Sequence, residues 1–506
     1  MAASIVALVP AFPAHAEDKQ SLKEQIDALK KIVAEQQAQL DALASQVQDT
    51  KVSTVNQFAD ERRIRAESPQ LTLKDNRPTF TSGDGRNSIS LRGRASLDVA
   101  SYDQGRSGPS ATDFRRGSFG DATEASRARD LNDGTNFRRA QLGLEGKLLN
   151  DWTYSLIYEF GGSGQEDGGR IQDLYLQYNG IEGLRLRAGA FGPSVGYDDS
   201  TSNADSLFLE RASPSELQRQ IAGGEGRTGI AAYANGEEWF ASLAVTGAPI
   251  ATQSFDEQLA LVGRVAYQIV KSPDFNVHIG ANATYLLQAP DQGPDLAARY
   301  QLRLRDRPEI RVDSTRLIDT GNINTDTLFA PGFELAATAG SLYVHGEYFL
   351  YQFERAQLPG PALSDPDFSG WYVQAAYALT GEKRAWNATN GVFAGLKPDS
   401  PLSPVGDGWG ALELALRYSV ADLNYGENLL PAAGGIRGGE QKAWTAGLNW
   451  YVNNNIRFLL DYQWVNVDRL STGAANAYGT GVFVPPAGSQ IGQDVQIVSV
   501  RTQFTF

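Results

Sequence analysis

The sequence predicts an all-β transmembrane barrel of sixteen antiparallel strands, preceded by an α-helical coiled coil. Three observations lead to this prediction. Apolar residues alternate with small or polar ones in sixteen segments, long and short connections take turns between these segments, and the chain ends in an amphipathic, aromatic strand. A barrel in lipid has these features because one face of each strand meets acyl chains while the other meets water.

The composition excludes several classes of protein. Beyond the N-terminus, the 506-residue chain has no run of eighteen apolar residues, so a helical membrane protein is excluded. The net charge of −14 argues against a nucleic-acid partner, because binding phosphates requires a basic surface. The chain has no cysteine, and therefore neither disulfides nor a cysteine-based zinc site; we expect no metal and no cofactor.

Residues 1–16 are expected to be a signal peptide. They combine a short apolar run with Ala14-His15-Ala16, which fits the small-x-small pattern of a cleavage site. The basic segment that normally precedes the apolar run is missing, and a disordered apolar N-terminus is the alternative.

Residues 17–60 are expected to form a coiled coil, followed by a linker over residues 61–85. Apolar residues recur there in alternating steps of four and three, without glycine or proline between Asp18 and Glu67. The seam has Ile26, Val33, Leu40 and Val47 at a positions and Leu22, Leu29, Gln36 and Leu43 at d positions. The pattern leaves the number of helices open, and a lone helix on the protein's own surface is the alternative.

Over residues 86–506 the apolar pattern has a period of two, which predicts the barrel. In one segment, for example, Leu412, Leu414 and Leu416 oppose Glu413 and Arg417. Soluble β-sandwiches also alternate, but aromatic strand ends and many repeats favour a lipid-facing wall. The expected strands are 88–100, 136–148, 151–160, 170–179, 184–191, 227–235, 238–246, 257–270, 274–287, 326–338, 341–353, 370–380, 409–422, 441–452, 455–467 and 493–506.

The connections between these strands alternate in length. Residues 101–135, 192–226, 288–325 and 468–492 are long, whereas connections such as Leu149-Asn150 and Asn453-Asn454 are tight turns. Long outer loops and short periplasmic turns produce this rhythm. One connection breaks it, because residues 381–408 should be a short turn and are not.

The last six residues, RTQFTF, are expected to close the barrel. Pairing of this final strand with the first leaves no strand edge in lipid. Phe504 and Phe506 would then face the membrane, with Phe506 at the periplasmic rim as an assembly residue. An aromatic C-terminal residue on an amphipathic strand is typical of bacterial outer-membrane proteins.

Residues 381–467 carry a family resemblance. The runs GEKRAWNATNGVFAGLKPDSPLSP, GWGALELALRYSVADLN and WTAGLNWYVNNNIRFLLDYQWVNV resemble the phosphate-selective porin O and P family, as do LFLERASPSEL and RPEIRVDSTRLIDTG. The resemblance covers roughly residues 80–506. It implies a trimer of sixteen-stranded barrels, a periplasmic coiled coil, and a third loop (192–226) folded into the pore. It also accounts for the long connection 381–408.

Alternation gives the residues that face the lumen, and arginine dominates among the basic ones. Arginine stays charged and offers a planar fork of donors to anions, so these residues predict an anion-preferring pore. The pore-lining or anion-binding candidates are Arg92, Arg94, Arg139, Arg185, Arg187, Arg264, Arg417 and Arg457 on strands, with Arg211, Arg219 and Arg227 from the third loop. Arg501 also faces inward.

An alternative is that these arginines only pair with acids. The inward acids are Asp98, Glu145, Glu159, Asp173, Glu413 and Asp461. The family resemblance implies phosphate selectivity through arginines and lysines, yet the third loop has no lysine. It carries Asp198, Asp199, Asp205, Glu210, Glu216 and Glu225 instead. This departure argues against tight phosphate binding.

Catalytic residues are not expected. His278 and His345, which remain after signal cleavage, lie in predicted strands and read as wall or packing residues; no GxSxG motif occurs. The predicted function is passive diffusion of small hydrophilic solutes, with anions such as phosphate preferred. The expected partners are outer-membrane lipids, permeating anions and two further copies of the chain, and no nucleic acid.

Two other functions are compatible with the sequence. One is a channel of the same fold for sugars or other neutral nutrients. It would be supported if Tyr343, Phe349 and Tyr351 faced inward, contrary to the strand phase we assign them. The other is a structural tether between the outer membrane and the cell wall, with the barrel as an anchor.

Overall fold

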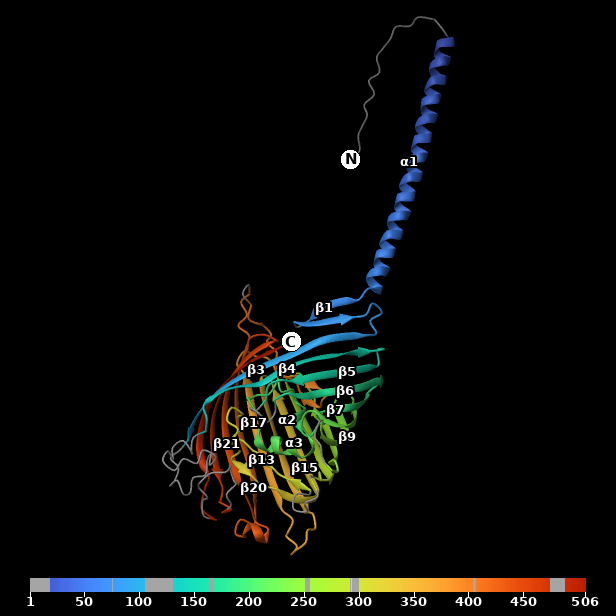
Figure 1. Cartoon of the computed structure of the whole chain (residues 1–506). Helices are drawn as coiled ribbons and strands as arrows, with labels where there is room; N and C mark the ends of the chain where they lie inside the picture. The colour runs from blue at the N-terminus through green and yellow to red at the C-terminus, as the bar shows by residue number, and fades with distance from the viewer. Residues whose placement is uncertain are drawn as a thin grey trace. The chain divides into compact units, whose positions relative to one another are not determined.

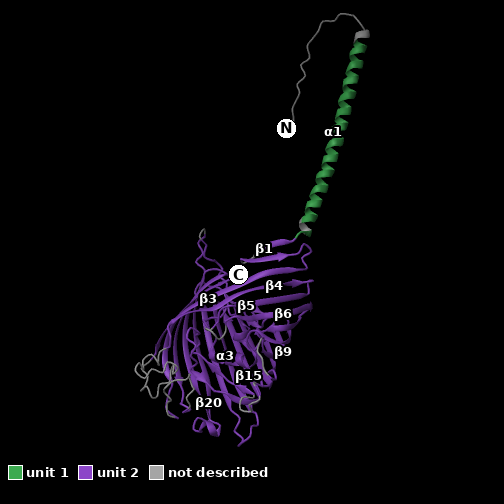
Figure 2. Ribbon diagram, in the orientation of Figure 1, with its two compact units in different colours: residues 1–68 green, residues 69–506 purple. Residues whose placement is uncertain are grey.

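The computed structural model describes residues 19–74, 76–104, 131–162, 168–250, 255–291, 293, 300–403, 406–473 and 487–506. The chain divides into two compact units, residues 1–68 and residues 69–506 (Figure 2). The expected signal peptide lies outside the described residues.

The first unit is a single long helix, α1 (Lys19–Glu67), which extends beyond the expected coiled-coil range. Its predicted seam is exposed on the single chain: the side chains of Leu22, Ile26, Leu29, Val33, Leu40, Leu43 and Val47 are between 45% and 61% exposed. Within the described ranges, no helix is both long and apolar enough to cross a membrane. The coiled coil itself stays a prediction.

The second unit contains a closed barrel of sixteen antiparallel strands, as predicted (Figure 1). Every strand pairs with its neighbours in chain order, and the last returns to the first. The strands are β3 (Ser88–Gln104), β4 (Gly134–Leu148), β5 (Trp152–Glu159), β6 (Arg170–Ile181), β7 (Leu184–Phe191), β8 (Arg227–Asn235), β9 (Trp239–Pro249), β10 (Leu259–Val270), β11 (Phe275–Gln288), β15 (Ile323–Ala339), β16 (Leu342–Arg355), β17 (Asp367–Ala378), β20 (Ala411–Tyr425), β21 (Ile436–Tyr451), β22 (Ile456–Asp468) and β23 (Gln493–Thr505).

The C-terminus closes the barrel as predicted. In the β23–β3 pairing, Phe504 lies opposite Ala95. Phe506 then exchanges two backbone hydrogen bonds of 3.0 Å with Gly93. A Cβ atom at Gly93 would come within 2.2 Å of the Phe506 ring, so glycine leaves the room that the terminal ring occupies.

Two further strands precede the barrel, in the region for which the sequence suggests a linker. β1 (Gln70–Lys74) and β2 (Arg77–Thr81) form a hairpin, and β2 adds to the start of β3 through pairs such as Thr79 with Ser90. The alternation in these strands covers only five residues each, which is too short to stand out in the sequence.

The inward and outward faces follow the predicted alternation on most strands. Trp371 and Tyr377 of β17 are exposed on the outer face, whereas Glu413 and Arg417 of β20 are buried inside. On β16 the assigned phase is wrong: Tyr343, Phe349 and Tyr351 are buried inside the barrel. This strand has aromatic residues on both faces, so polarity alone does not distinguish them.

The barrel interior is partly filled by three connections. The third loop (192–226) carries α2 (Tyr197–Ser200) and α3 (Ser213–Ala222), and α3 contacts the strands from β9 to β20. The fifth loop (289–322) carries β12 (Gln301–Leu302), β13 (Arg305–Asp306) and β14 (Ile318–Asp319). The long turn (379–410) carries β18 (Trp386–Asn387) and β19 (Val392–Phe393).

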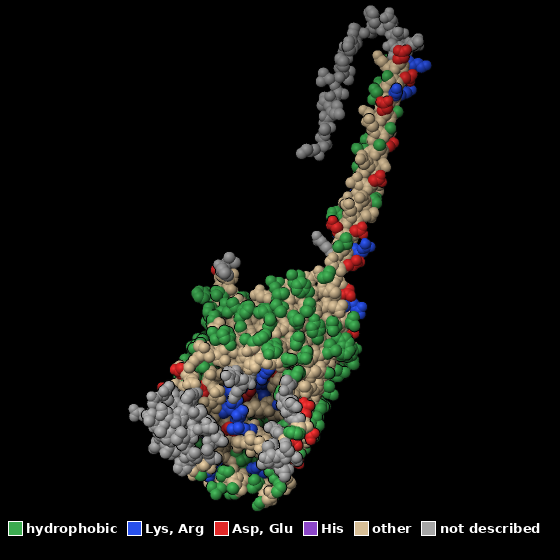
Figure 3. Space-filling view, in the orientation of Figure 1, with side chains coloured by type: hydrophobic (Ala, Val, Ile, Leu, Met, Phe, Trp, Pro, Cys, Tyr) green, Lys and Arg blue, Asp and Glu red, His purple; other side chains and the backbone are tan. Residues whose placement is uncertain are grey.

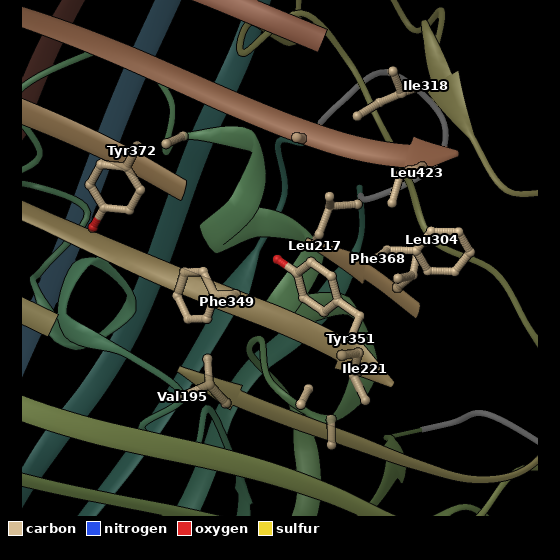
Figure 4. Packing of buried hydrophobic residues seen from close by; sticks show 14 of the residues in the cluster. Val195, Leu217, Ile221, Leu304, Ile318, Phe349, Tyr351, Phe368, Tyr372 and Leu423 are labelled. Carbon is tan, nitrogen blue, oxygen red and sulfur yellow. The ribbon is translucent and has the colours of Figure 1, made fainter. Parts of the chain in front are cut away.

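A hydrophobic core therefore lies within the barrel instead of between two sheets. Leu217 and Ile221 of α3 pack with Phe349 and Tyr351 of β16 and with Leu304 of the fifth loop (Figure 4). The outer surface shows a broad hydrophobic band (Figure 3). Apolar groups thus face lipid outside and fix the third loop inside.

Candidate functional site

The inner wall of the barrel divides into two arcs. From β10 to β23, which we call the packed arc, inward side chains are buried along nearly the whole of each strand. From β3 to β8, which we call the open arc, several inward side chains are half-buried. They are Arg92, Glu145, Thr153, Asp173, Tyr175, Asn179, Arg185, Arg187 and Asn235. The space for water and solutes thus lies against the open arc. A hollow in the surface of the barrel shows basic side chains (Figure 3).

The third loop is fixed in the lumen by carboxylates that bind arginines. Glu210 accepts hydrogen bonds from Arg138 at 2.6 and 3.0 Å and from Arg501 at 2.9 Å, and it lies 3.3 Å from Arg311. Burial opposes ionisation, but these guanidinium groups hold the pKa of Glu210 well below its ordinary value. The charged Glu210 carboxylate, neutralised by these arginines, therefore holds the third loop in the lumen.

A β-bulge turns two consecutive arginines into the lumen. Arg139 pairs with Ser96, but the next pair joins Phe137 to Leu97, so Arg138 is an extra residue in β4. Both side chains are consequently buried inside, where strict alternation would send one outward. We predicted Arg139 as an inward residue and missed Arg138 for this reason.

Three further acids of the third loop, Asp199, Glu216 and Glu225, are bound in the same way. Arg219 of α3 pairs with Asp199, with Glu216 at 3.0 Å and with Glu225 at 2.8 Å. Glu225 also lies 3.5 Å from Arg139 on the wall. Four of the six third-loop acids are thus paired with arginines of the loop and the wall.

In the packed arc, Arg417 is bound by groups of two loops. Its guanidinium donates to Glu309 of the fifth loop at 2.6 Å and to the Glu210 carbonyl oxygen at 2.9 Å, and it lies over the Phe208 ring. Glu309 also accepts from the Ser213 amide at the N-terminus of α3 at 2.8 Å. This arginine joins the wall to two loops.

Arg264 holds the long turn inside the barrel. It pairs with Glu334 at 2.8 Å and donates to the carbonyl oxygens of Asn390 at 2.7 Å and Gly391 at 2.6 Å. The Phe393 amide donates to the Tyr197 hydroxyl of the third loop at 2.9 Å. The long turn and the third loop therefore meet in the lumen.

Three further predicted arginines also have partners. Arg92 pairs with Glu145. Arg211 donates to backbone carbonyl oxygens of residues 198, 199 and 201 in its own loop. Arg227 donates to carbonyl oxygens at the C-terminal end of α3, including that of Gly223, where a cation complements the helix dipole.

Six of the predicted arginines have no carboxylate within ion-pairing distance among the described residues. Two of them, Arg211 and Arg227, donate to backbone carbonyl oxygens as described above. We call the other four, Arg94, Arg185, Arg187 and Arg457, the acid-free arginines. Arg94 is 3.5 Å from the Ser202 hydroxyl, and Arg457 donates to the Ala204 carbonyl at 3.0 Å. Arg185 and Arg187 lie side by side on β7 in the open arc. Their charges are available to a permeating anion.

A cavity of about 610 Å³ lies at the end of the barrel that has the short turns. Arg77, Arg92 and Arg94 line it, together with Ser202 of the third loop. Arg77 and Arg92 share Glu145, so the three guanidinium groups have one carboxylate between them. This part of the lumen carries a positive excess.

The inward aromatic residues of β16 pack against the loops and not against open space. Tyr351 is fully buried and donates to the Pro214 carbonyl oxygen at 2.7 Å, while Tyr343 donates to the Tyr197 hydroxyl at 2.9 Å. His278 and His345 are buried in the same region, where we expected wall or packing histidines. The aromatic residues of β16 are therefore not exposed to the lumen, and they give no support to a sugar channel.

The sequence reasoning missed the partners supplied by the loops. Glu309 and Arg311 of the fifth loop and Arg384 of the long turn each form an ion pair inside the barrel. Alternation assigns faces to strand residues only, so it gives no information on these positions. The sequence holds one weak indication of such a partner: Arg384 lies in a connection that is too long to be a simple turn.

Comparisons with known proteins give one family and several similar proteins. A family model described as phosphate-selective porin O and P matches residues 114–506. Porin O of Pseudomonas aeruginosa is 24% identical over 370 residues, which cover 69% of this chain and 80% of the relative. An uncharacterised protein of Caulobacter vibrioides is 28% identical over 472 residues, 88% of this chain and 85% of the relative. The solved anion-selective porin of Comamonas acidovorans is 13% identical, with 83% of this chain and 100% of that chain covered and a TM-score of 0.43.

Proposed function

The chain belongs to the phosphate-selective porin O and P family and is an outer-membrane channel, and we propose that it passes small hydrophilic solutes by passive diffusion with a preference for anions such as phosphate. The third loop would act as the steric filter. No energy source or cofactor takes part in this mechanism.

The observation that carries the anion preference is the set of acid-free arginines. Arg185 and Arg187 face the open arc with formal charges that no carboxylate of the described residues neutralises. Fixed positive charge in a narrow, low-dielectric lumen raises the local concentration of anions and lowers their barrier. A guanidinium also binds an oxyanion without losing its charge at any relevant pH.

The ion pairs of the third loop support the same proposal. Four of its six acids, Asp199, Glu210, Glu216 and Glu225, are bound by arginines, so they offset the acid-free arginines less than their number suggests. The loop has no lysine, which favours weak and rapidly exchanging anion sites over tight phosphate binding.

We also propose that three copies assemble and that α1 forms a trimeric coiled coil in the periplasm. The exposed apolar seam of α1 would leave large side chains in water on a single chain. Burying them between copies removes that cost. Removal of residues 17–60 distinguishes a channel from a tether, since a channel still conducts without the helix.

The test is the reversal potential of purified protein in a planar bilayer across a KCl gradient, with phosphate then titrated in. We expect a potential on the chloride side and block by millimolar phosphate, on the order of the weak affinities typical of channel sites. The double variant Arg185→Gln/Arg187→Gln should shift the potential toward zero. Arg86→Gln, which removes an exposed turn arginine, is the matched control and should leave it unchanged.

A near-zero or cation-side potential in the unaltered protein would reject the anion preference. The channel would then be a general porin, and neutral solutes such as sugars would be the next candidates, measured by liposome swelling.

A further inference from the structure

The surroundings of Arg187 differ from those of the other acid-free arginines. Its Cζ atom lies 4.1 Å from the ring centre of Tyr175, 4.8 Å from that of Tyr233 and 5.4 Å from that of Phe191. Its Nε and Nη2 atoms donate to the Gln177 side-chain oxygen at 3.0 and 2.8 Å. The guanidinium is thus held flat among aromatic rings by a neutral partner.

The strand register builds this arrangement. Gln177 lies opposite Arg187 and Tyr175 lies opposite Gly189 in the β6–β7 pairing. Gly189 in turn lies opposite Gly229, so two adjacent inward positions carry no side chain. The Tyr175 ring can therefore lie along the wall toward Arg187 instead of standing away from it.

Tyr233 supplies an unused donor at the same place. This side chain is 6% exposed, and its hydroxyl has no hydrogen-bond partner among the described residues. A buried hydroxyl without a partner is unfavourable, unless a ligand completes it. The Arg185 guanidinium lies 5.3 Å from the same ring. Two cations and one free hydroxyl thus converge on one part of the open arc.

We propose that Arg187, Tyr175 and Tyr233 form a binding site for aromatic carboxylates within the pore. The proposal rests on the proposed function, because it names a substrate class for the same anion pathway. The carboxylate would accept hydrogen bonds from the free edge of Arg187 and from the Tyr233 hydroxyl, and the ring of the solute would stack on Tyr175.

The geometry favours a planar carboxylate over phosphate. A tetrahedral phosphate is bound best by donors that converge from several directions, whereas Arg187 has rings beside its faces and one edge occupied by Gln177. What remains is one polar edge beside an apolar surface. A flat solute with one charged end matches both parts.

The other acid-free arginines lack this combination. Arg94 has no aromatic ring against its guanidinium among the described residues. Arg457 lies 4.4 Å from the ring centre of Tyr451, but the Tyr451 hydroxyl already donates to Glu413 at 2.7 Å. The proposal therefore applies to the β6–β8 part of the wall and not to every arginine of the pore.

The experiment measures block of the chloride current through the whole protein by benzoate, cyclohexanecarboxylate and acetate at pH 7.5. Cyclohexanecarboxylate has the size and charge of benzoate but no aromatic face, so it is the matched solute. Benzoate should block at a concentration about fivefold lower than cyclohexanecarboxylate, which is the contribution expected of one stacked aromatic pair.

Three variants separate the parts of the site. Tyr233→Phe removes only the free hydroxyl and should weaken benzoate block about tenfold, as loss of a buried hydrogen bond to a charged group does. Tyr175→Leu should remove the preference for benzoate over cyclohexanecarboxylate. Asp173→Asn, which removes the carboxylate two residues from Tyr175, should strengthen block by all three solutes.

Tyr377→Leu removes a lipid-facing tyrosine that is 51% exposed and is the matched control, with no change in block expected. The channel conductance in KCl and the heat-modified migration of each variant verify that the barrel has folded.

The inference and the proposed function fail separately. A chloride-side reversal potential with equal block by benzoate and cyclohexanecarboxylate would overturn the aromatic site and leave the anion channel standing. The aromatic site would also be overturned if neither Tyr233→Phe nor Tyr175→Leu changed the block by benzoate. A cation-side potential would reject the proposed function, whereas selective, tyrosine-dependent benzoate block would still uphold the site.

Discussion

Arg417 in the packed arc and Arg187 in the open arc are the same residue type at inward positions of the same barrel, yet their surroundings differ. Arg417 is 1% exposed and bound to the Glu309 carboxylate, whereas Arg187 is half-buried and held by the neutral Gln177. The difference comes from the loops. Glu309 of the fifth loop reaches Arg417, whereas no carboxylate of the described residues lies within ion-pairing distance of Arg187.

This comparison connects charge pairing with burial. A guanidinium removed from water needs a counter-charge and hydrogen bonds, because its desolvation otherwise costs several kcal/mol. A half-buried guanidinium keeps part of its hydration and can remain without a counter-ion. The two roles of an inward arginine, bracing the wall and attracting anions, are thus assigned by the neighbouring loops.

The largest effect should follow from breaking the Arg417–Glu309 pair. Arg417→Leu leaves the Glu309 carboxylate buried without its cation, and we expect a loss of about 3–5 kcal/mol in the free energy of unfolding. Arg187→Gln is the matched variant in the open arc and should cost only about 1–2 kcal/mol, since it removes ring contacts and two hydrogen bonds to the neutral Gln177 but orphans no counter-ion. Urea unfolding in detergent or lipid vesicles, followed by tryptophan fluorescence, measures both.

Similar losses for the two variants would contradict the division into arcs. The double variant Arg417→Leu/Glu309→Leu provides a further check, because replacing both members of a buried pair by apolar groups should restore much of the stability.

The fold was predictable because a barrel in lipid repeats one simple rule. Leu412, Leu414 and Leu416 must face acyl chains and Glu413 and Arg417 must not, and this alternation locates β20 and its fifteen companions without tertiary information. The rule fails on β16, where aromatic residues occupy both faces. It also fails at the bulge beside Arg138, where an extra residue shifts the phase.

The site was predictable only in part, for a related reason. Alternation identified the inward arginines, but the identity of each partner depends on where the third loop, the fifth loop and the long turn fold. Glu309 reaches Arg417 across 108 residues of sequence, and Asn390 reaches Arg264 across 126. No local pattern contains such pairings, so the sequence could not separate Arg187 from Arg417.

A second, smaller effect should follow from removing an acid of the third loop. Glu225→Gln removes the carboxylate that Arg139 and Arg219 share and adds net positive charge to the lumen. We expect the chloride-to-potassium permeability ratio to rise about twofold, the size expected of one partly screened charge at nanometre distance. Reversal potentials in 0.1 and 1 M KCl, about the range over which screening changes, test this.

Glu237→Gln removes an exposed acid at a turn and serves as the control. A fall in anion selectivity on Glu225→Gln would mean that the loop has left its docked position, and a rise in total conductance would accompany it.

The smallest effect should be a change of selectivity with pH that originates in the fifth loop. Burial, reinforced by the charge of Glu216, raises the pKa of Asp306 to about 7, against the lowering effect of Arg311 and of the hydrogen bond of 2.7 Å from the Ser213 hydroxyl. Asp306 is therefore largely neutral at pH 5.5 and charged at pH 8.5. Raising the pH adds a negative charge beside α3, and the anion preference should fall slightly.

The stability of the docked loop should change in the same direction. A carboxyl group whose folded pKa is raised contributes stability that is complete below its ordinary value of 3.8 and is lost as the pH rises through about 7. Asp306→Asn keeps the shape but cannot ionise, so its selectivity should be the same at pH 5.5 and 8.5. If the unaltered protein and this variant changed equally, the titrating group would lie elsewhere. If the selectivity changed with pH only in the unaltered protein, the single buried carboxyl group of Asp306 behind α3 would control the anion selectivity of the open arc.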